Sequence, residues 1–480
     1  MHFDSYSFIF LFLPFSVICY FLLCKISSKL AKYFLIVCSL FFYAGLEYKM
    51  LFWLLSSIGL NYLVIYMLKR MSNKKLILWT GIAINVASLF YYKYWTFTLS
   101  TIQSFFHVDS DVREIVLPIG ISFIIFHQIS YLVDTYRNQT NNQSFWDYVL
   151  FVVYYPKILM GPIVTQDILI PQFHEQTKFR VDAKNIIKGI QMFVFGLSKK
   201  AILANTFARA VDWGYANLST ATSLDLIIVL FAYAFQIYFD FSGYSDMAIG
   251  VSYLFNIELP INFDSPYKAS SIREFWRRWH VSLTKYFTKY VYIPLGGNKE
   301  GKLNTCINTL IVFVISGIWH GANWTFLLWG LIHGLLSLFD RFTENIRKAH
   351  SFAQWLGTFI AVSILWLLFR SNSISEWIGI LNKIVSFSSI KLNEGLLGVF
   401  KQPEVNLLLS LPILSSLNVK IRGLALILFF AVSIIICLFF QNTYKRKYKP
   451  SIISAIAVAV VLVFCLTCFS SESVFVYYNF

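Results

Sequence analysis

Charged residues are scarce in this sequence. They make up 13% of its 480 residues, whereas a soluble globular chain carries roughly 25%. Hydrophobic residues make up 57%, and they gather in long uninterrupted runs. This composition excludes an ordinary soluble domain and indicates an integral membrane protein.

Cysteine is also scarce, and the seven cysteines lie mostly inside apolar segments. None has a histidine nearby at metal-ligand spacing, so we expect neither a disulfide framework nor a metal site. Cys465 and Cys468 have redox-motif spacing, but they lie in an expected spanning helix, so we interpret them as packing residues. The sequence lacks the Gly-x-Ser-x-Gly, P-loop and His-Glu-x-x-His motifs, so serine hydrolase, NTPase and metalloprotease functions have no support.

Acidic residues are the minority charge, with 24 Asp and Glu against 40 Lys and Arg and a net charge of +16. The basic residues form short clusters between apolar runs, as in residues 69–75 and 444–449. This pattern is typical of cytosolic loops of membrane proteins and argues against a nucleic-acid partner. It predicts that both clusters lie in the cytosol and that Phe480 lies outside.

The apolar runs predict an all-α polytopic membrane protein, because a spanning helix needs about 20 apolar residues. The first run lacks the basic start and cleavage site of a secretory signal, so we expect it to remain as a helix. Recurrent prolines and glycines between 117 and 171 indicate kinked helices beside a cavity. We expect roughly 11–13 spanning or re-entrant helices in a single domain, 1–480. The main runs are 6–24, 31–47, 50–68, 76–99, 191–206, 224–238, 310–339, 355–370, 374–387, 403–417, 422–440 and 451–470.

One stretch, Ser270 to Asp340, concentrates arginine, tryptophan and histidine among apolar residues. It opens with SSIREFWRRWHVSLTKYFTKYVYIPLGGN and closes with GIWHGANWTFLLWGLIHGLLSLFD. In residues 271–292, Trp276 and His280 share one helical face, which predicts a single amphipathic helix at the membrane interface. His320 interrupts a continuous apolar segment, where an ionisable residue marks a functional site by default.

The residue types in this stretch suit acyl transfer to a hydroxyl group. A histidine such as His320 can take the hydroxyl proton near neutral pH. Guanidinium groups bind phosphates through paired donors, so the arginines either bind an anionic donor such as a coenzyme A thioester or anchor the helix at the interface. We interpret His127 and His333 as packing residues, and we expect Asp240 and Asp246 to hold a broken helix.

Four short pieces of the sequence resemble the membrane-bound O-acyltransferases, and within them the bacterial alginate O-acetylases. They are FDFSGYSD at 239–246, REFWRRWH at 273–280, WHG at 319–321 and FVYYNF at 475–480. The resemblance implies that His320 is catalytic and that His280 is a second functional residue, at a position that is often Asn or Asp in other branches. The candidate substrate-binding residues are Arg273, Arg277, Arg278, Trp276, Trp279, Asp240, Asp246 and Asn323.

The resemblance also implies a fold and a function. Residues 1–110 would be N-terminal helices, 117–340 a catalytic core around a tunnel, and 350–480 C-terminal helices and a tail. The chain would pass acetyl from cytosolic acetyl-CoA, a donor substrate rather than a cofactor, across the bacterial cytoplasmic membrane to a polysaccharide such as alginate or peptidoglycan. Membrane lipids would surround it, and an extracytoplasmic acetyltransferase would dock at its C-terminal tail.

Two alternatives stay open at this point. One is the transfer of D-alanine from a carrier-protein thioester to teichoic acid, because members of that branch also end in an aromatic tail. The other is a transporter of polysaccharide or lipid precursors without acyltransferase chemistry, although the sequence shows no repeat-related halves.

Overall fold

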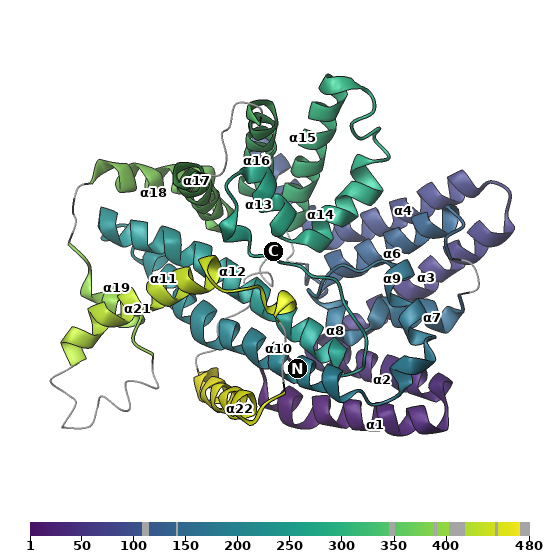
Figure 1. The fold of residues 1–480 in the computed structure, drawn as a ribbon. Helices are drawn as coiled ribbons and strands as arrows, with labels where there is room; N and C mark the ends of the chain where they lie inside the picture. Colours follow the sequence, from purple (N-terminus) through teal and green to yellow (C-terminus); the bar gives the residue numbers. More distant parts are fainter. Residues whose placement is uncertain are drawn as a thin grey trace. The chain divides into compact units, whose positions relative to one another are not determined.

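The computed structural model describes residues 1–480 except 108–114, 141–142, 345–350, 388, 390, 403–417, 447–449 and 471–480 (Figure 1). The described residues form helices and no strand, which confirms the all-α class. The expected span at 403–417 and the C-terminal tail lie outside the described residues.

The described chain divides into two compact units. The first unit comprises residues 1–193 and 247–261, and the second comprises 194–246 and 262–480. Two of the three boundaries fall inside α10 (Ala183–Ser198) and α12 (Ser223–Tyr253), and the third lies in the loop after α12. The expectation of a single domain stays a prediction.

The first unit contains the four helical segments expected in the first hundred residues. The first, Phe8–Ile26, is shifted by two residues from its predicted run, and the other three are longer than theirs. Aromatic side chains of the first two segments and of α8 pack together, with the rings of Phe42 and Tyr155 at 5.4 Å. The helices are η1 (Phe8–Phe12), α1 (Leu13–Ile26), α2 (Ser28–Glu47), α3 (Leu51–Arg70), α4 (Lys74–Leu89), α5 (Trp95–Phe106), α6 (Ile121–Tyr136), α7 (Phe145–Val153), α8 (Tyr155–Ile158) and α9 (Gln166–Leu169).

The second unit holds the stretch rich in arginine, tryptophan and histidine. Its helices α15 and α16 pack closely because glycines face each other, with a Cβ at Gly317 reaching within 3.2 Å of the Gly330 Cα. The helices are η6 (Lys199–Ala204), α11 (Asn205–Ala216), α13 (Ile272–Arg278), α14 (Val281–Phe287), η8 (Thr288–Tyr292), α15 (Gly301–His320), α16 (Trp324–Thr343), α17 (Phe352–Arg370), α18 (Ile374–Ser386), α19 (Glu394–Val399), α21 (Asn418–Leu438) and α22 (Ile452–Thr467).

Six helical segments of the described chain are long and apolar enough to cross a membrane. They are 8–26, 28–70, 74–106, 223–253, 301–320 and 352–370, and two shorter apolar helices cover 423–438 and 452–467. The protein is therefore a multi-pass membrane protein. The expected total counted shorter and re-entrant helices as well.

The structure corrects two local expectations. The helix expected at 224–238 continues through Asp240 and Asp246 to Tyr253, so the predicted helix break at these carboxylates is wrong. The single amphipathic helix predicted for 271–292 is also wrong, because α13 ends at Arg278 and α14 begins at Val281. Between them His280 adopts a left-handed conformation (φ 44°), which an α-helix does not contain.

Candidate active site

His280 lies in the sharp turn between α13 and α14. Positive φ is unusual for a residue other than glycine, and such strained residues concentrate at functional sites. The loop residue Asn262 stabilises the turn, because its carbonyl accepts the Val281 N–H (2.9 Å) and its side-chain oxygen accepts the Ser282 hydroxyl (2.8 Å). The turn brings His280 against Phe241 of α12, with ring centroids 4.8 Å apart.

His320 is the last residue of α15. Gly321 follows it in extended backbone, and a side chain at this position would overlap the ring of Phe326. The helix therefore ends immediately after the histidine. His320 is 3% exposed and contacts Trp329 of α16, with ring centroids 5.2 Å apart.

Alternating histidine and tryptophan rings connect His280, His320 and His333, the histidines of this unit that the structure describes. Trp319 contacts both His280 (6.1 Å between centroids) and His320 (4.9 Å). Trp329 contacts both His320 (5.2 Å) and His333 (4.8 Å). The structure therefore brings the two predicted catalytic histidines into one aromatic cluster, with Trp319 between them.

His333 is fixed by a hydrogen bond rather than left to packing alone. The Trp276 indole N–H donates to its Nδ1 (3.2 Å), so this nitrogen is unprotonated and the ring is held in one tautomer. The helices α15 and α16 are in close contact beside His333, since a Cβ at Gly334 would lie 3.0 Å from the Leu310 side chain.

His280 is buried (1% exposed) and uncharged at neutral pH, because burial lowers the pKa of its imidazole to about 3. Neither ring nitrogen hydrogen-bonds to another described residue. Buried polar atoms are normally paired. The imidazole of His280 can therefore accept or donate a hydrogen bond to a substrate group without first losing a protein partner.

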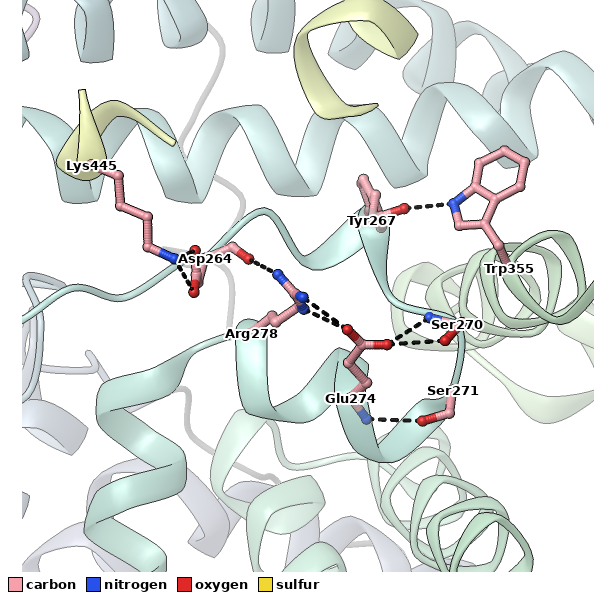
Figure 2. Close-up of polar contacts among 8 residues, drawn as sticks. All are labelled: Asp264, Tyr267, Ser270, Ser271, Glu274, Arg278, Trp355 and Lys445. Carbon is pink, nitrogen blue, oxygen red and sulfur yellow. Dashed lines mark hydrogen bonds and ion pairs between the residues drawn. The ribbon is translucent and has the colours of Figure 1, made fainter. Parts of the chain in front are cut away.

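Two of the three predicted phosphate-binding arginines are held by glutamates. Arg278 donates from Nε (3.0 Å) and Nη2 (2.8 Å) to Oε1 of Glu274, and from Nη1 (3.1 Å) to the carbonyl of Asp264 (Figure 2). The Asp264 carboxylate in turn binds Lys445 (2.8 Å). Arg273 pairs with Glu344 of the segment that follows α16.

Arg277 differs from its two neighbours. Its side chain is exposed, and no described residue forms an ion pair or hydrogen bond with it. Among the three arginines, Arg277 can therefore bind an anionic group without breaking an existing ion pair.

The two predicted carboxylates of α12 bind adjacent lysines of η6. Asp240 accepts from Lys200 (2.7 Å) and Asp246 from Lys199 (2.6 Å), and both pairs are largely buried. Gly243 lies between the two aspartates, and a Cβ there would come within 2.7 Å of the Gly196 carbonyl. The missing side chain lets the helices approach closely enough for both pairs to form.

The remaining predicted substrate-binding residues lie in structural positions. Trp279 is fully buried and contacts Trp366 (4.8 Å between centroids). Asn323 caps α16, because its side-chain oxygen accepts the Thr325 N–H (3.0 Å).

Sequence reasoning missed three residues that organise this site. Lys199 and Lys200 carry a usable signal, since two adjacent lysines at the end of an apolar run need carboxylate partners. Asn262 carries none, because its contacts with the turn at His280 depend on the folded loop.

The chain is similar to several known proteins. The profile of the membrane-bound O-acyltransferase family matches residues 124–373. A peptidoglycan O-acetyltransferase of Helicobacter pylori is 33% identical, over 100% of this chain and 97% of that one. A probable alginate O-acetylase of Pseudomonas putida is 34% identical over 82% of each chain. A teichoic acid D-alanyltransferase of Streptococcus thermophilus is 30% identical over 45% of this chain and 55% of the other.

Proposed function

Because this chain belongs to the membrane-bound O-acyltransferase family and is an O-acyltransferase, we propose that it passes acetyl from acetyl-CoA across the membrane for O-acetylation of a polysaccharide outside the cytosol. Two similar proteins carry peptidoglycan and alginate in their names, which supports a cell-envelope or exported polysaccharide as the acceptor. The donor is cytosolic, so the reaction would link both sides of the bacterial cytoplasmic membrane.

The observation that carries this proposal is the contact of His280 and His320 with the same tryptophan, Trp319. Two buried histidines in one cluster provide a base and a second hydrogen-bonding group for one reaction centre. One nitrogen of His320 takes the proton from the acceptor hydroxyl as its oxygen attacks the thioester carbonyl. The carbon–sulfur bond then breaks, and coenzyme A leaves as a thiol after it regains a proton.

His280 and Arg277 have supporting roles in this proposal. An imidazole N–H of His280 would donate to the oxygen that gains negative charge during attack, which is the interaction that most lowers such barriers. The exposed guanidinium of Arg277 would bind a phosphate of coenzyme A. No cofactor is needed for this chemistry.

The decisive experiment measures consumption of radiolabelled acetyl-CoA by the purified protein and acetylation of the polymer in cells. We expect His320→Ala to remain inserted and to lose about 10²–10⁴-fold in rate. His174→Ala is the matched control, because that side chain is 51% exposed and lies outside the cluster. Near-normal transfer by a folded His320→Ala protein would overturn the proposal.

The docking of a partner protein at the C-terminal tail is tested separately. An extracytoplasmic acetyltransferase would complete the transfer after docking at the tail, so deleting 473–480 should leave the protein inserted but abolish polymer acetylation. Full polymer acetylation after the deletion would exclude docking there.

D-alanyl transfer is the second candidate, supported by a similarity that covers 45% of the chain. The transporter alternative is not retained, because the chain is an O-acyltransferase.

A further inference from the structure

Lys157 of α8 is a fully buried lysine of the first unit. It is 0% exposed, and its Nζ has no hydrogen-bond partner among the described residues. The ammonium instead lies over the ring of Phe151, 4.6 Å from the centroid. The buried Lys200 of the second unit differs, because it binds Asp240 at 2.7 Å.

A second base lies against the same aromatic ring. His127 of α6 is 1% exposed, and its ring centroid is 5.5 Å from that of Phe151. The positive charge of Lys157 acts on His127, and no described carboxylate forms an ion pair with either residue. Lys157 and His127 therefore both contact the ring of Phe151, and no described carboxylate is paired with either of them.

Two glycines fix the backbone that turns Lys157 inward. A Cβ at Gly161 would lie 2.5 Å from the Lys157 Cα, so only glycine permits this turn. Gly120, at the start of α6, has φ +73°, and a Cβ there would lie 3.0 Å from the Ile158 carbonyl. The buried position of Lys157 is therefore set by the fold and does not result from a flexible side chain.

A buried ammonium without a partner costs several kcal/mol. Such a group either loses its proton or binds an anion. Burial lowers the pKa of Lys157 well below its ordinary value, which favours loss of the proton. The position of Nζ over the Phe151 face argues the other way, because an aromatic face attracts the charged ammonium and not the neutral amine.

We propose that Lys157 and His127 form a binding site for a small oxyanion, a carboxylate or a phosphate, in the first unit. The ammonium donates up to three hydrogen bonds and an imidazole N–H donates one more, which matches the acceptor oxygens of such an anion. Phe151 packs against both bases on its ring. None of these three residues is among those assigned to acyl transfer.

The test measures thermal unfolding of the purified full-length protein in detergent. The reference buffer contains gluconate, a much bulkier anion, and phosphate or acetate replaces it at constant ionic strength. We expect either small anion to raise the melting temperature by about 2 °C or more, because a ligand that binds only the folded state stabilises it. A second arm adds phosphatidylglycerol without phosphate, to distinguish a lipid headgroup from a free ion.

Two variants connect the effect to Lys157. Lys157→Met leaves no carboxylate unpaired. In this variant phosphate and acetate should no longer raise the melting temperature, and the melting temperature in gluconate should be equal to or higher than that of the wild type. Lys200→Met is the control, since it leaves Asp240 unpaired and should destabilise the protein while the anion response remains. If Lys157→Met does not fold, His127→Phe should weaken the response. Equal melting temperatures of the wild type in all buffers, or an unchanged response in the variants, would show that Lys157 is a neutral packing residue.

Discussion

The left-handed backbone at His280 restricts which residues the position accepts. Asn, Asp and His are the non-glycine residues found most often in this conformation. Histidine is therefore one of the few side chains with a titratable ring nitrogen that this backbone conformation accepts without a large strain.

We predict that His280→Asn retains the stability of the fold and that His280→Val is less stable. A β-branched residue at φ 44° is strained, and we expect His280→Val to be about 1–2 kcal/mol less stable than His280→Asn. Thermal unfolding monitored by tryptophan fluorescence measures the difference. Equal melting temperatures of the two variants would contradict the strain argument.

Arg277 and Arg278 are adjacent residues with different predicted roles. We expect Arg277→Gln to raise the KM for acetyl-CoA about 10-fold at nearly constant kcat, because it removes one charged contact to the donor. Arg278→Gln should instead lower the melting temperature, since Glu274 loses its partner. Steady-state kinetics of both variants provides the comparison, and an unchanged KM in Arg277→Gln would exclude it from donor binding.

At the scale of the helix, α12 depends on the absence of a side chain at Gly243. A Cβ there would press on the Gly196 carbonyl and separate the two lysine–aspartate pairs. We therefore expect Gly243→Ala to destabilise the protein by at least 1 kcal/mol. Gly357→Ala in α17 is the matched control, because its Cβ would meet no atom within 4 Å and alanine favours helix. A similar melting temperature for both variants would show that the close approach is not needed.

The short helix α13 is stabilised by a charge that titrates in acid. Burial raises the pKa of Glu274, but the Ser270 N–H and the Arg278 guanidinium outweigh it and hold the net pKa below the ordinary 4.5. A carboxyl group whose pKa is lower in the folded than in the unfolded protein stabilises the fold at pH values above its unfolded-state pKa. This stabilisation is lost as the pH falls through the folded-state pKa. Glu274→Gln should therefore be less stable than the wild type at pH 7. The difference in stability between the two proteins should become smaller below pH 4.5. A gap independent of pH would contradict this account.

At the scale of the whole molecule, the basic clusters predict the orientation in the membrane. In a background without native cysteines, a cysteine at Ser72 or at Arg446 should react with an impermeant maleimide only after the cells are permeabilised. A cysteine at Phe480 should react in intact cells. The reverse pattern would invert the topology and place the proposed partner on the wrong side.

The sequence by itself determined the properties that depend on composition and local order. The length of the apolar runs identified a multi-pass helical membrane protein, because the bilayer sets the length of a spanning helix. The position of His320 in an apolar segment predicts a functional residue without reference to any tertiary contact. The Glu274–Arg278 pair, at a spacing of four residues on one helix face, can also be predicted from the sequence.

The tertiary structure alone decided the properties that depend on contacts between distant segments. The periodicity of residues 271–292 predicts one helix, but the hydrogen bonds of Asn262 favour a turn at His280. The continuity of α12 through two aspartates likewise depends on lysines about 40 residues earlier in the chain. Intrinsic helix preference varies by less than about 1 kcal/mol among most residue types, so the free energy of these contacts exceeds it. Local patterns therefore identified the segments, whereas tertiary packing determined which of their polar groups are paired.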